Sequence, residues 1–206
     1  MHTMFRKSAV SVGVLFAALL AGGWLCPPAG RADDKSLTYP SQVLIIRHAE
    51  KPVDDPTSPE LTPEGKDRAV ELYKLFEQSG MRPKPFATPD FLFAGKDTMK
   101  SHRPRLTVVP LAKKLKLAVN SEYGNADMDK LVDELFHNPK YTGKVVLISW
   151  RHGAIPKLAP KLKATGSPEK WEDEVYDRVW QITYDRAGKA SFVDLPQHLR
   201  LKDSEK

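Results

Sequence analysis

The stretch Gln42-Val43-Leu44-Ile45-Ile46-Arg47-His48 decides the fold of this chain. Its aliphatic residues follow one another without polar alternation, which is typical of a strand buried on both faces of a parallel sheet. A second run of the same kind, residues 144–150, leads directly into Arg151-His152-Gly153. Two buried strands that each end in an Arg-His pair therefore organise the predicted sheet.

The rest of the chain supplies helices and further short strands around these two runs. Helices are expected at residues 62–79, 103–115, 127–136 and 155–162, and strands at residues 91–94, 117–119, 180–184 and 190–195. Thr62-Pro63 is a helix start, because Thr caps a helix and Pro suits its first position. Strands and helices alternate until a final hairpin. We therefore predict an α/β three-layer sandwich with a mainly parallel central sheet, flanked by helices and carrying an antiparallel C-terminal edge.

Composition points to one globular domain behind an export signal. The 206 residues are 41% hydrophobic and 28% charged, which excludes wholesale disorder, and one Cys cannot form an internal disulfide framework. Arg6-Lys7, an apolar run over residues 8–25, and Gly30 and Ala32 at positions −3 and −1 of a cleavage site form a secretory signal. We expect a signal peptide at residues 1–32, a tether at 33–40 and the domain at 41–206. An uncleaved membrane anchor is the alternative.

The predicted export signal changes how the net charge is interpreted. The formal charge of the whole chain is +6, but residues 1–32 contain Arg6, Lys7 and Arg31 and no acidic residue, so the mature chain carries +3. Such a mild excess argues against a nucleic-acid partner, which usually meets a clustered basic face. We expect a periplasmic or extracellular protein whose contact with the membrane is confined to the N-terminal segment.

The two Arg-His pairs predict a phosphoryl site. Ligands of open α/β sheets bind beyond the carboxyl ends of the strands, where His48 and His152 would meet if their strands are neighbours. Arginine binds phosphate through a planar fork of donors, and a neutral histidine is a nucleophile near neutral pH. A zinc site is the rival use of the two histidines, but the adjacent Arg47 and Arg151 make a bound cation costly.

At these residues the chain resembles the histidine phosphatase superfamily, the phosphoglycerate-mutase-like proteins. Residues 43–52 match the family's strand followed by Arg-His, and Leu61-Thr62-Pro63-Glu64-Gly65 with Ala69 resembles its helix start. Ser101, Arg103 and Thr107 are similar to its "S-x-R-x-x-x-T" helix, and residues 147–153 resemble its strand before the second His-Gly. The four matches occur in the family's order.

The resemblance implies a role for each matching residue. His48 would be the nucleophile that becomes phosphohistidine, and Arg47, Arg103 and His152 would hold the equatorial oxygens. Arg105 would lie about 200° around the helix from Arg103 and cannot share its direction. The resemblance also implies no metal and no organic cofactor. We therefore expect a metal-independent phosphomonoester hydrolase rather than a mutase.

The general acid and the remaining pocket residues stay open. Gly153 stands where one branch of the family has an aspartate, so Glu122 is the candidate acid and Asp127 the runner-up. Glu50 is a candidate substrate-binding residue or only orders its loop. Arg151 adds a donor to the pocket or faces an acidic loop.

The substrate is expected to be a phosphorylated small molecule or a phosphoprotein. Without a large insertion between the strands we expect an open site, bordered by the polar segment at residues 162–174. Two alternatives remain: a non-catalytic phosphate-binding or envelope-interaction protein that keeps the fold, and a metal-dependent hydrolase.

Overall fold

The computed structural model describes residues 38–55, 57–200 and 203. The predicted signal peptide and most of the predicted tether lie outside these ranges. Within them no helix combines the length and the apolar character that crossing a membrane requires.

The described chain contains one mixed sheet of six strands. In chain order these are β1 (Gln42–Arg47), β2 (Phe91–Ala94), β3 (Val119–Asn120), β4 (Val145–Trp150), β5 (Arg178–Tyr184) and β6 (Ala190–Pro196). Their order across the sheet is β3-β2-β4-β1-β5-β6. The first four of these are mutually parallel, whereas β5 runs antiparallel to β1 and β6 antiparallel to β5. The predicted parallel sheet with an antiparallel C-terminal edge is therefore confirmed.

Strands β1 and β4 are direct neighbours, and their register brings the two Arg-His pairs together. Arg47, the last residue of β1, lies opposite Trp150, the last residue of β4. The two strands run parallel to each other, so the chain leaves the sheet at the same edge after each of them. His48 and His152 consequently follow the sheet side by side, as the sequence predicted.

Helices flank the sheet and mostly begin where expected. They are α1 (Pro63–Glu71), α2 (Arg103–Leu115), α3 (Met128–His137) and α4 (Ile155–Lys161), with 3-10 turns at Leu72–Phe76, Asn125–Asp127 and Pro139–Tyr141. The Thr62 hydroxyl accepts a hydrogen bond from the Gly65 amide and caps α1. The predicted first helix tightens to 3-10 geometry after Glu71, and α2 continues through Pro110.

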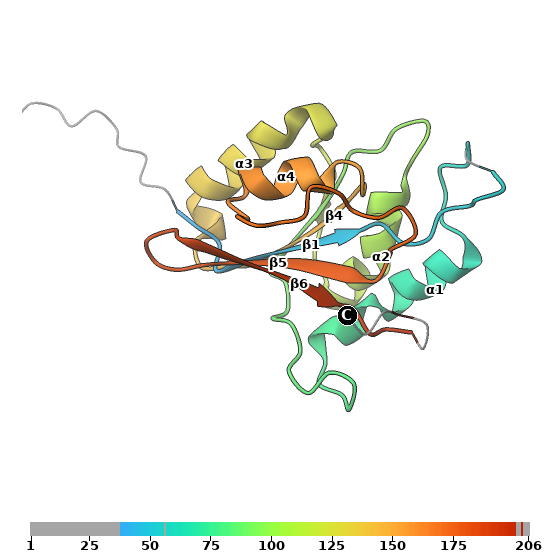
Figure 1. The fold of residues 1–206 in the computed structure, drawn as a ribbon, viewed down its shortest axis with the longest axis horizontal. Coiled ribbons are helices and arrows are strands. Elements are labelled where there is room, and N and C mark those ends of the chain that lie inside the picture. Colours follow the sequence, from blue (N-terminus) through green and yellow to red (C-terminus); the bar gives the residue numbers. More distant parts are fainter. Residues whose placement is uncertain (1–37, 56, 201–202, 204–206) are drawn as a thin grey trace, which may run out of the picture. The chain divides into compact units, whose positions relative to one another are not determined.

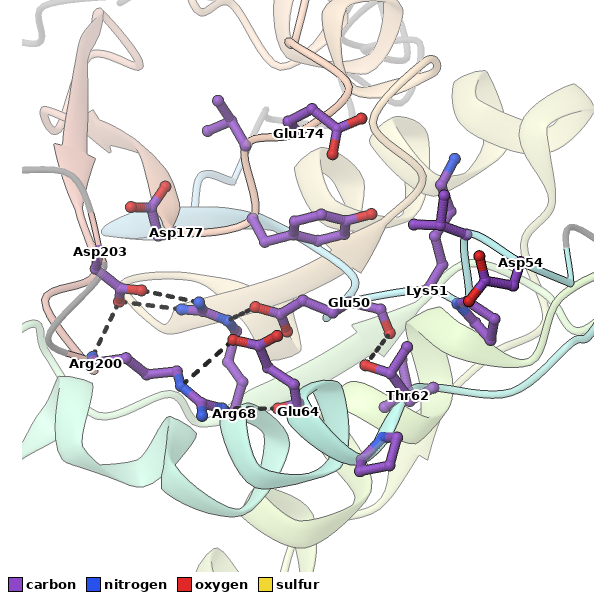
Figure 2. Close-up of a pocket in the computed structure, with 16 residues that line it drawn as sticks. Glu50, Lys51, Asp54, Thr62, Glu64, Arg68, Glu174, Asp177, Arg200 and Asp203 are labelled. Carbon is purple, nitrogen blue, oxygen red and sulfur yellow. Dashed lines mark hydrogen bonds and ion pairs between the residues drawn. The ribbon is translucent and has the colours of Figure 1, made fainter.

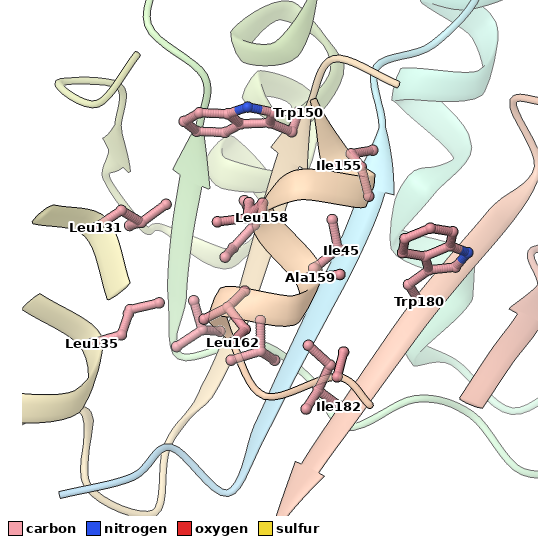
Figure 3. Packing of buried hydrophobic residues seen from close by; sticks show 14 of the residues in the cluster. Ile45, Leu131, Leu135, Trp150, Ile155, Leu158, Ala159, Leu162, Trp180 and Ile182 are labelled. Atoms are coloured by element: carbon pink, nitrogen blue, oxygen red, sulfur yellow. The ribbon is translucent and has the colours of Figure 1, made fainter. Parts of the chain in front are cut away.

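Alternate residues of β1 enter two different hydrophobic cores. Val43 and Ile45 pack with α3 and α4 on one face, and Leu44 and Ile46 pack with α2 on the other. Figure 1 shows α3 and α4 on one side of the sheet and α1 and α2 on the other. Figure 3 shows α4 lying across β1, with its apolar side chains directed at the strand. Burial on both faces explains the unbroken aliphatic run at residues 43–46.

Candidate active site

His48 is the first residue after β1, and its orientation is fixed by two backbone hydrogen bonds. Its amide donates to the Trp150 carbonyl at 3.0 Å. Its Nδ1 lies 2.7 Å from the Ala49 carbonyl oxygen. A carbonyl oxygen only accepts, so Nδ1 carries the ring proton and Nε2 keeps its lone pair. The geometry therefore presents Nε2 of a neutral imidazole as the reactive atom.

Burial and neighbouring cations keep this imidazole neutral. The side chain is almost fully buried, and loss of solvation lowers the pKa of His48 to about 3. The hydrogen bond to Ala49 acts in the opposite direction, whereas the charges of Arg47, Arg103 and His152 lower the pKa further. The residues that act on His48 are thus the set that the sequence singled out.

Arg47 lies beneath the loop that precedes β5. Its Nη1 donates to the carbonyl oxygens of Glu172, Asp173 and Val175, and the Tyr176 ring lies 3.7 Å from its guanidinium carbon. Burial lowers the pKa of Arg47 from its ordinary value. Its Nε and Nη2 are buried and have no partner among the described residues. One edge of the guanidinium is held by the protein, and the other edge is buried without a described partner.

Arg103 opens α2, and Thr107 one turn later ties this helix to the loop that follows His48. The Thr107 hydroxyl donates to the Arg103 carbonyl and accepts the Ala49 amide proton, both at 2.8 Å. Arg103 donates from Nη1 to the Ser58 carbonyl, while its buried Nε has no described partner. Arg105 instead pairs with Asp97 at 2.7 Å. The structure therefore separates the two arginines as helical geometry predicted.

His152 contacts an acidic residue that the sequence analysis did not single out. Its Nε2 lies 3.0 Å from Oδ1 of Asp173. Its Nδ1 is buried and unpartnered within the described ranges. Burial and the charge of Arg47 lower the pKa of His152, while Asp173 raises it. The second histidine is therefore held at one nitrogen and free at the other.

Glu50 orders the loop that follows His48 through a buried ion-pair network. Its carboxylate accepts from Arg68 Nε at 2.8 Å, and Arg68 also binds both carboxylate oxygens of Asp203. Figure 2 shows the Arg68 guanidinium between these two carboxylates. Gly65 approaches so closely that a Cβ there would lie 2.6 Å from the Glu50 carbonyl oxygen. The loop-ordering interpretation of Glu50 therefore has direct structural support, and a substrate contact remains a prediction.

The remaining predicted residues have no hydrogen bond to His48 or His152 in the described part of the chain. Arg151 donates to the carbonyl oxygens of Lys96 and Ser101, and the charges of Arg103 and Asp97 act on it. Glu122 is exposed on the loop after the edge strand β3, and its amide donates to the Asn120 side chain. Asp127 accepts from the Gly124 amide and pairs with Lys130, which is a capping role. The structure brings neither acid into contact with the two histidines, and the role of Glu122 stays a prediction.

Tyr176 corrects the expectation of an open site. Its ring centroid is 6.3 Å from that of His48, and the same ring lies over the Arg47 guanidinium. Arg47 and His48 are only 1% and 3% exposed beneath this loop. The expected border at residues 162–174 pointed to the right region, but the covering residues extend to Tyr176. Neither Tyr176 nor Asp173 stands in a motif, so only their position shortly before a predicted strand was available as a signal.

The geometry suits a tetrahedral oxyanion beside His48. Buried donors on Arg47, Arg103 and His152 lack partners among the described residues, and buried polar groups without partners call for an explanation. A cavity of about 960 Å³ lies on the far side of the loop after His48, and its lining includes Glu50, Lys51, Arg68 and Tyr176 but not Arg47, His48, Arg103 or His152. The described residues contain no cluster of three or more His, Cys, Asp or Glu side chains that could hold a metal ion.

Comparisons with known proteins agree with this architecture. No protein-family model and no curated protein sequence matches the chain. Solved structures do match: the protein histidine phosphatase SixA complexed with tungstate is 16% identical, covers 76% of this chain and 97% of its own, and has a TM-score of 0.50. Phosphoglycerate mutase from Bacillus anthracis is 13% identical, with 78% and 94% coverage and a TM-score of 0.50. Phosphoglycerate mutase from Plasmodium falciparum is 12% identical, with 80% and 97% coverage and the same TM-score. The chain has the phosphoglycerate-mutase-like α/β fold.

Proposed function

We propose that this protein is a phosphomonoester hydrolase that acts through a phosphohistidine intermediate on His48. The observation that carries the proposal is the state of this histidine. Its Nδ1 proton is committed to the Ala49 carbonyl and its ring is kept neutral, so Nε2 is a nucleophile at every pH where the protein would act.

The surrounding cations supply what phosphoryl transfer requires. The three equatorial oxygens of the transferring group need donors, and unpartnered N–H groups of Arg47 and Arg103, whose charges act on His48, can supply them. The related fold of SixA was solved with tungstate, itself a tetrahedral oxyanion. The substrate is then a phosphorylated small molecule or a phosphorylated side chain.

The reaction then has two balanced steps. In the first, His48 Nε2 forms a bond to phosphorus, the bond to the leaving oxygen breaks, and that oxygen takes up a proton. In the second, water attacks phosphorus, the N–P bond breaks and water gives up a proton. Inorganic phosphate leaves and neutral His48 is restored.

The test is a panel of phosphomonoesters across pH 4–8, combined with trapping of an acid-labile phosphoenzyme. The protein should hydrolyse at least one of them, and His48→Ala should abolish both turnover and the trapped intermediate. Unchanged turnover in His48→Ala would refute the mechanism. Phosphate binding without turnover would establish the non-catalytic alternative, and loss of activity with a chelator would establish a metal-dependent reaction.

We further propose that the protein acts outside the cytoplasm, because residues 1–32 have the layout of a secretory signal. N-terminal sequencing of protein recovered from cell fractions tests this. A soluble exported form that begins at Asp33 is expected. A membrane-bound form that retains Met1 would support the anchor instead.

A further inference from the structure

The proposed hydrolysis leaves one requirement without an assigned residue, namely the proton for the leaving oxygen. His48 cannot supply it, because its one ring proton is bonded to the Ala49 carbonyl. Arg47 and Arg103 are arginines and keep their protons in proteins. Glu122 lies in the exposed loop after β3, which stands three strands away from β1 in the sheet.

The contact between His152 and Asp173 has the form of a histidine oriented by a carboxylate. Nε2 of His152 is 3.0 Å from Oδ1 of Asp173, so a proton on Nε2 is held in this hydrogen bond. The opposite nitrogen, Nδ1, is buried and has no partner in the described part of the chain. His152 also acts electrostatically on His48, which places it beside the nucleophile.

The backbone around Asp173 is fixed to the phosphate-binding side of the site. Its own carbonyl oxygen accepts a hydrogen bond from Arg47, as do the carbonyls of Glu172 and Val175 on either side. The Asp173 carboxylate is 69% exposed, and its described ion-pair partner is His152. A carboxylate on an anchored backbone can orient an imidazole without being buried itself.

We propose that His152 is the general acid and base of the reaction and that Asp173 is the residue that positions and charges it. In the acid form, Nε2–H donates to Asp173 and Nδ1–H donates to the leaving oxygen. As the P–O bond breaks, the Nδ1 proton moves to that oxygen and His152 becomes neutral. When water attacks the phosphohistidine, its proton returns to Nδ1 while the N–P bond breaks. This inference rests on the proposed function.

The charged groups around His152 explain why a carboxylate is needed there. Burial, Arg47 on β1 and Lys51 on the loop after it all lower the pKa of His152, and Asp173 on the loop before β5 opposes them. The pKa of His152 lies below its ordinary value even with Asp173 in place, so the loss of Asp173 would disfavour the imidazolium further. A carboxylate at Nε2 restores part of the acid form, just as a neighbouring anion generally favours a cation.

The experiment compares two substrates that differ in their need for a proton. The nitrophenolate leaving group of p-nitrophenyl phosphate departs readily as an anion, whereas the alkoxide of glycerol 2-phosphate must be protonated. In Asp173→Asn the amide still accepts from Nε2–H but carries no charge. We expect kcat/KM for glycerol 2-phosphate to fall about 10- to 100-fold and that for p-nitrophenyl phosphate to change less than about threefold.

A pH profile and matched variants separate this role from a structural one. The alkaline limb of the glycerol 2-phosphate profile should move to lower pH in Asp173→Asn, and Asp173→Glu should recover part of the rate. Glu169→Gln, an exposed carboxyl four residues earlier in the chain, is the control and should match the wild type. Thermal unfolding of each variant checks that the fold is retained.

Each further outcome bears on one claim. Three results would overturn the role of Asp173. In Asp173→Asn these are an equal fall of kcat/KM with both substrates or no fall with either. The third is a leaving-group-dependent fall in Glu122→Gln that is absent from Asp173→Asn. If the wild type forms a phosphoenzyme while Asp173→Asn behaves normally, this inference fails alone. If the wild type turns over no phosphomonoester of the panel and forms no phosphoenzyme, the proposed function fails.

Discussion

Replacing His48 with Asn should change how the stability of the protein depends on pH. Asn keeps an N–H that can donate to the Ala49 carbonyl, but it cannot take up a proton. In the wild type the folded state holds His48 neutral down to about pH 3, because the ring is buried next to Arg47 and Arg103. The unfolded chain protonates the same ring at the ordinary value of 6.5.

The size of the effect follows from these two values. Between pH 6.5 and about pH 3 the unfolded state binds one more proton at His48 than the folded state, so lowering the pH favours unfolding. The loss is about 1.4 kcal/mol per pH unit below the unfolded-state pKa. From pH 7 to pH 5 the wild type should therefore lose about 2 kcal/mol relative to His48→Asn, whatever constant offset the substitution itself causes.

Urea unfolding measured at pH 7, 6, 5.5 and 5 provides the test. The buried Trp150, Trp171 and Trp180 make tryptophan fluorescence a suitable signal. The quantity of interest is the difference in unfolding free energy between wild type and variant at each pH, since all other titrating groups are common to both. A difference that stays constant across the series would show that His48 is not held neutral and would refute the reasoning.

Three further substitutions test the architecture of the site. Gly65→Ala should destabilise the fold by about 1–3 kcal/mol and reduce turnover, because its Cβ would collide with the Glu50 backbone; urea unfolding and an aryl phosphate assay measure both. Thr107→Val should cost about 1–3 kcal/mol in urea unfolding by leaving the buried Ala49 amide unpaired, whereas Thr107→Ser should retain most of the stability. Tyr176→Leu should weaken inhibition by inorganic phosphate about threefold to tenfold, because the ring that holds the Arg47 guanidinium is lost, while Tyr176→Phe should stay closer to wild type.

Much of the fold was predictable because its signals are local. The unbroken aliphatic runs of β1 and β4 reflect burial on both faces of the sheet, and Thr62-Pro63 marks a helix start through the side chain of Thr62 itself. Adjacency of β1 and β4 was a condition of the prediction, and the register of the two strands meets that condition. The meeting of His48 and His152 was therefore within reach of the sequence.

The unpredicted parts of the site depend on contacts between distant segments. Asp173 contacts His152 from a different loop. The carbonyls of Glu172 and Val175 accept from Arg47, which lies more than a hundred residues earlier in the sequence. No periodicity or turn chemistry encodes such a contact. The expectation of an open site was wrong for the same reason, since a short loop without a motif covers His48 as effectively as a large insertion.

The central place of β1 in the sheet also determines when the site can form during synthesis. The ribosome releases β1 early, but its neighbours β4 and β5 pair through residues about a hundred or more positions later, such as Val146 and Ile182 opposite Val43. At about 5–20 residues per second this strand waits roughly 5–20 s with both edges unpaired. An aliphatic edge exposed for that time is a template for association with other chains. The feature that places His48 at the centre of the sheet therefore also prolongs the time in which the nascent chain can associate with other chains.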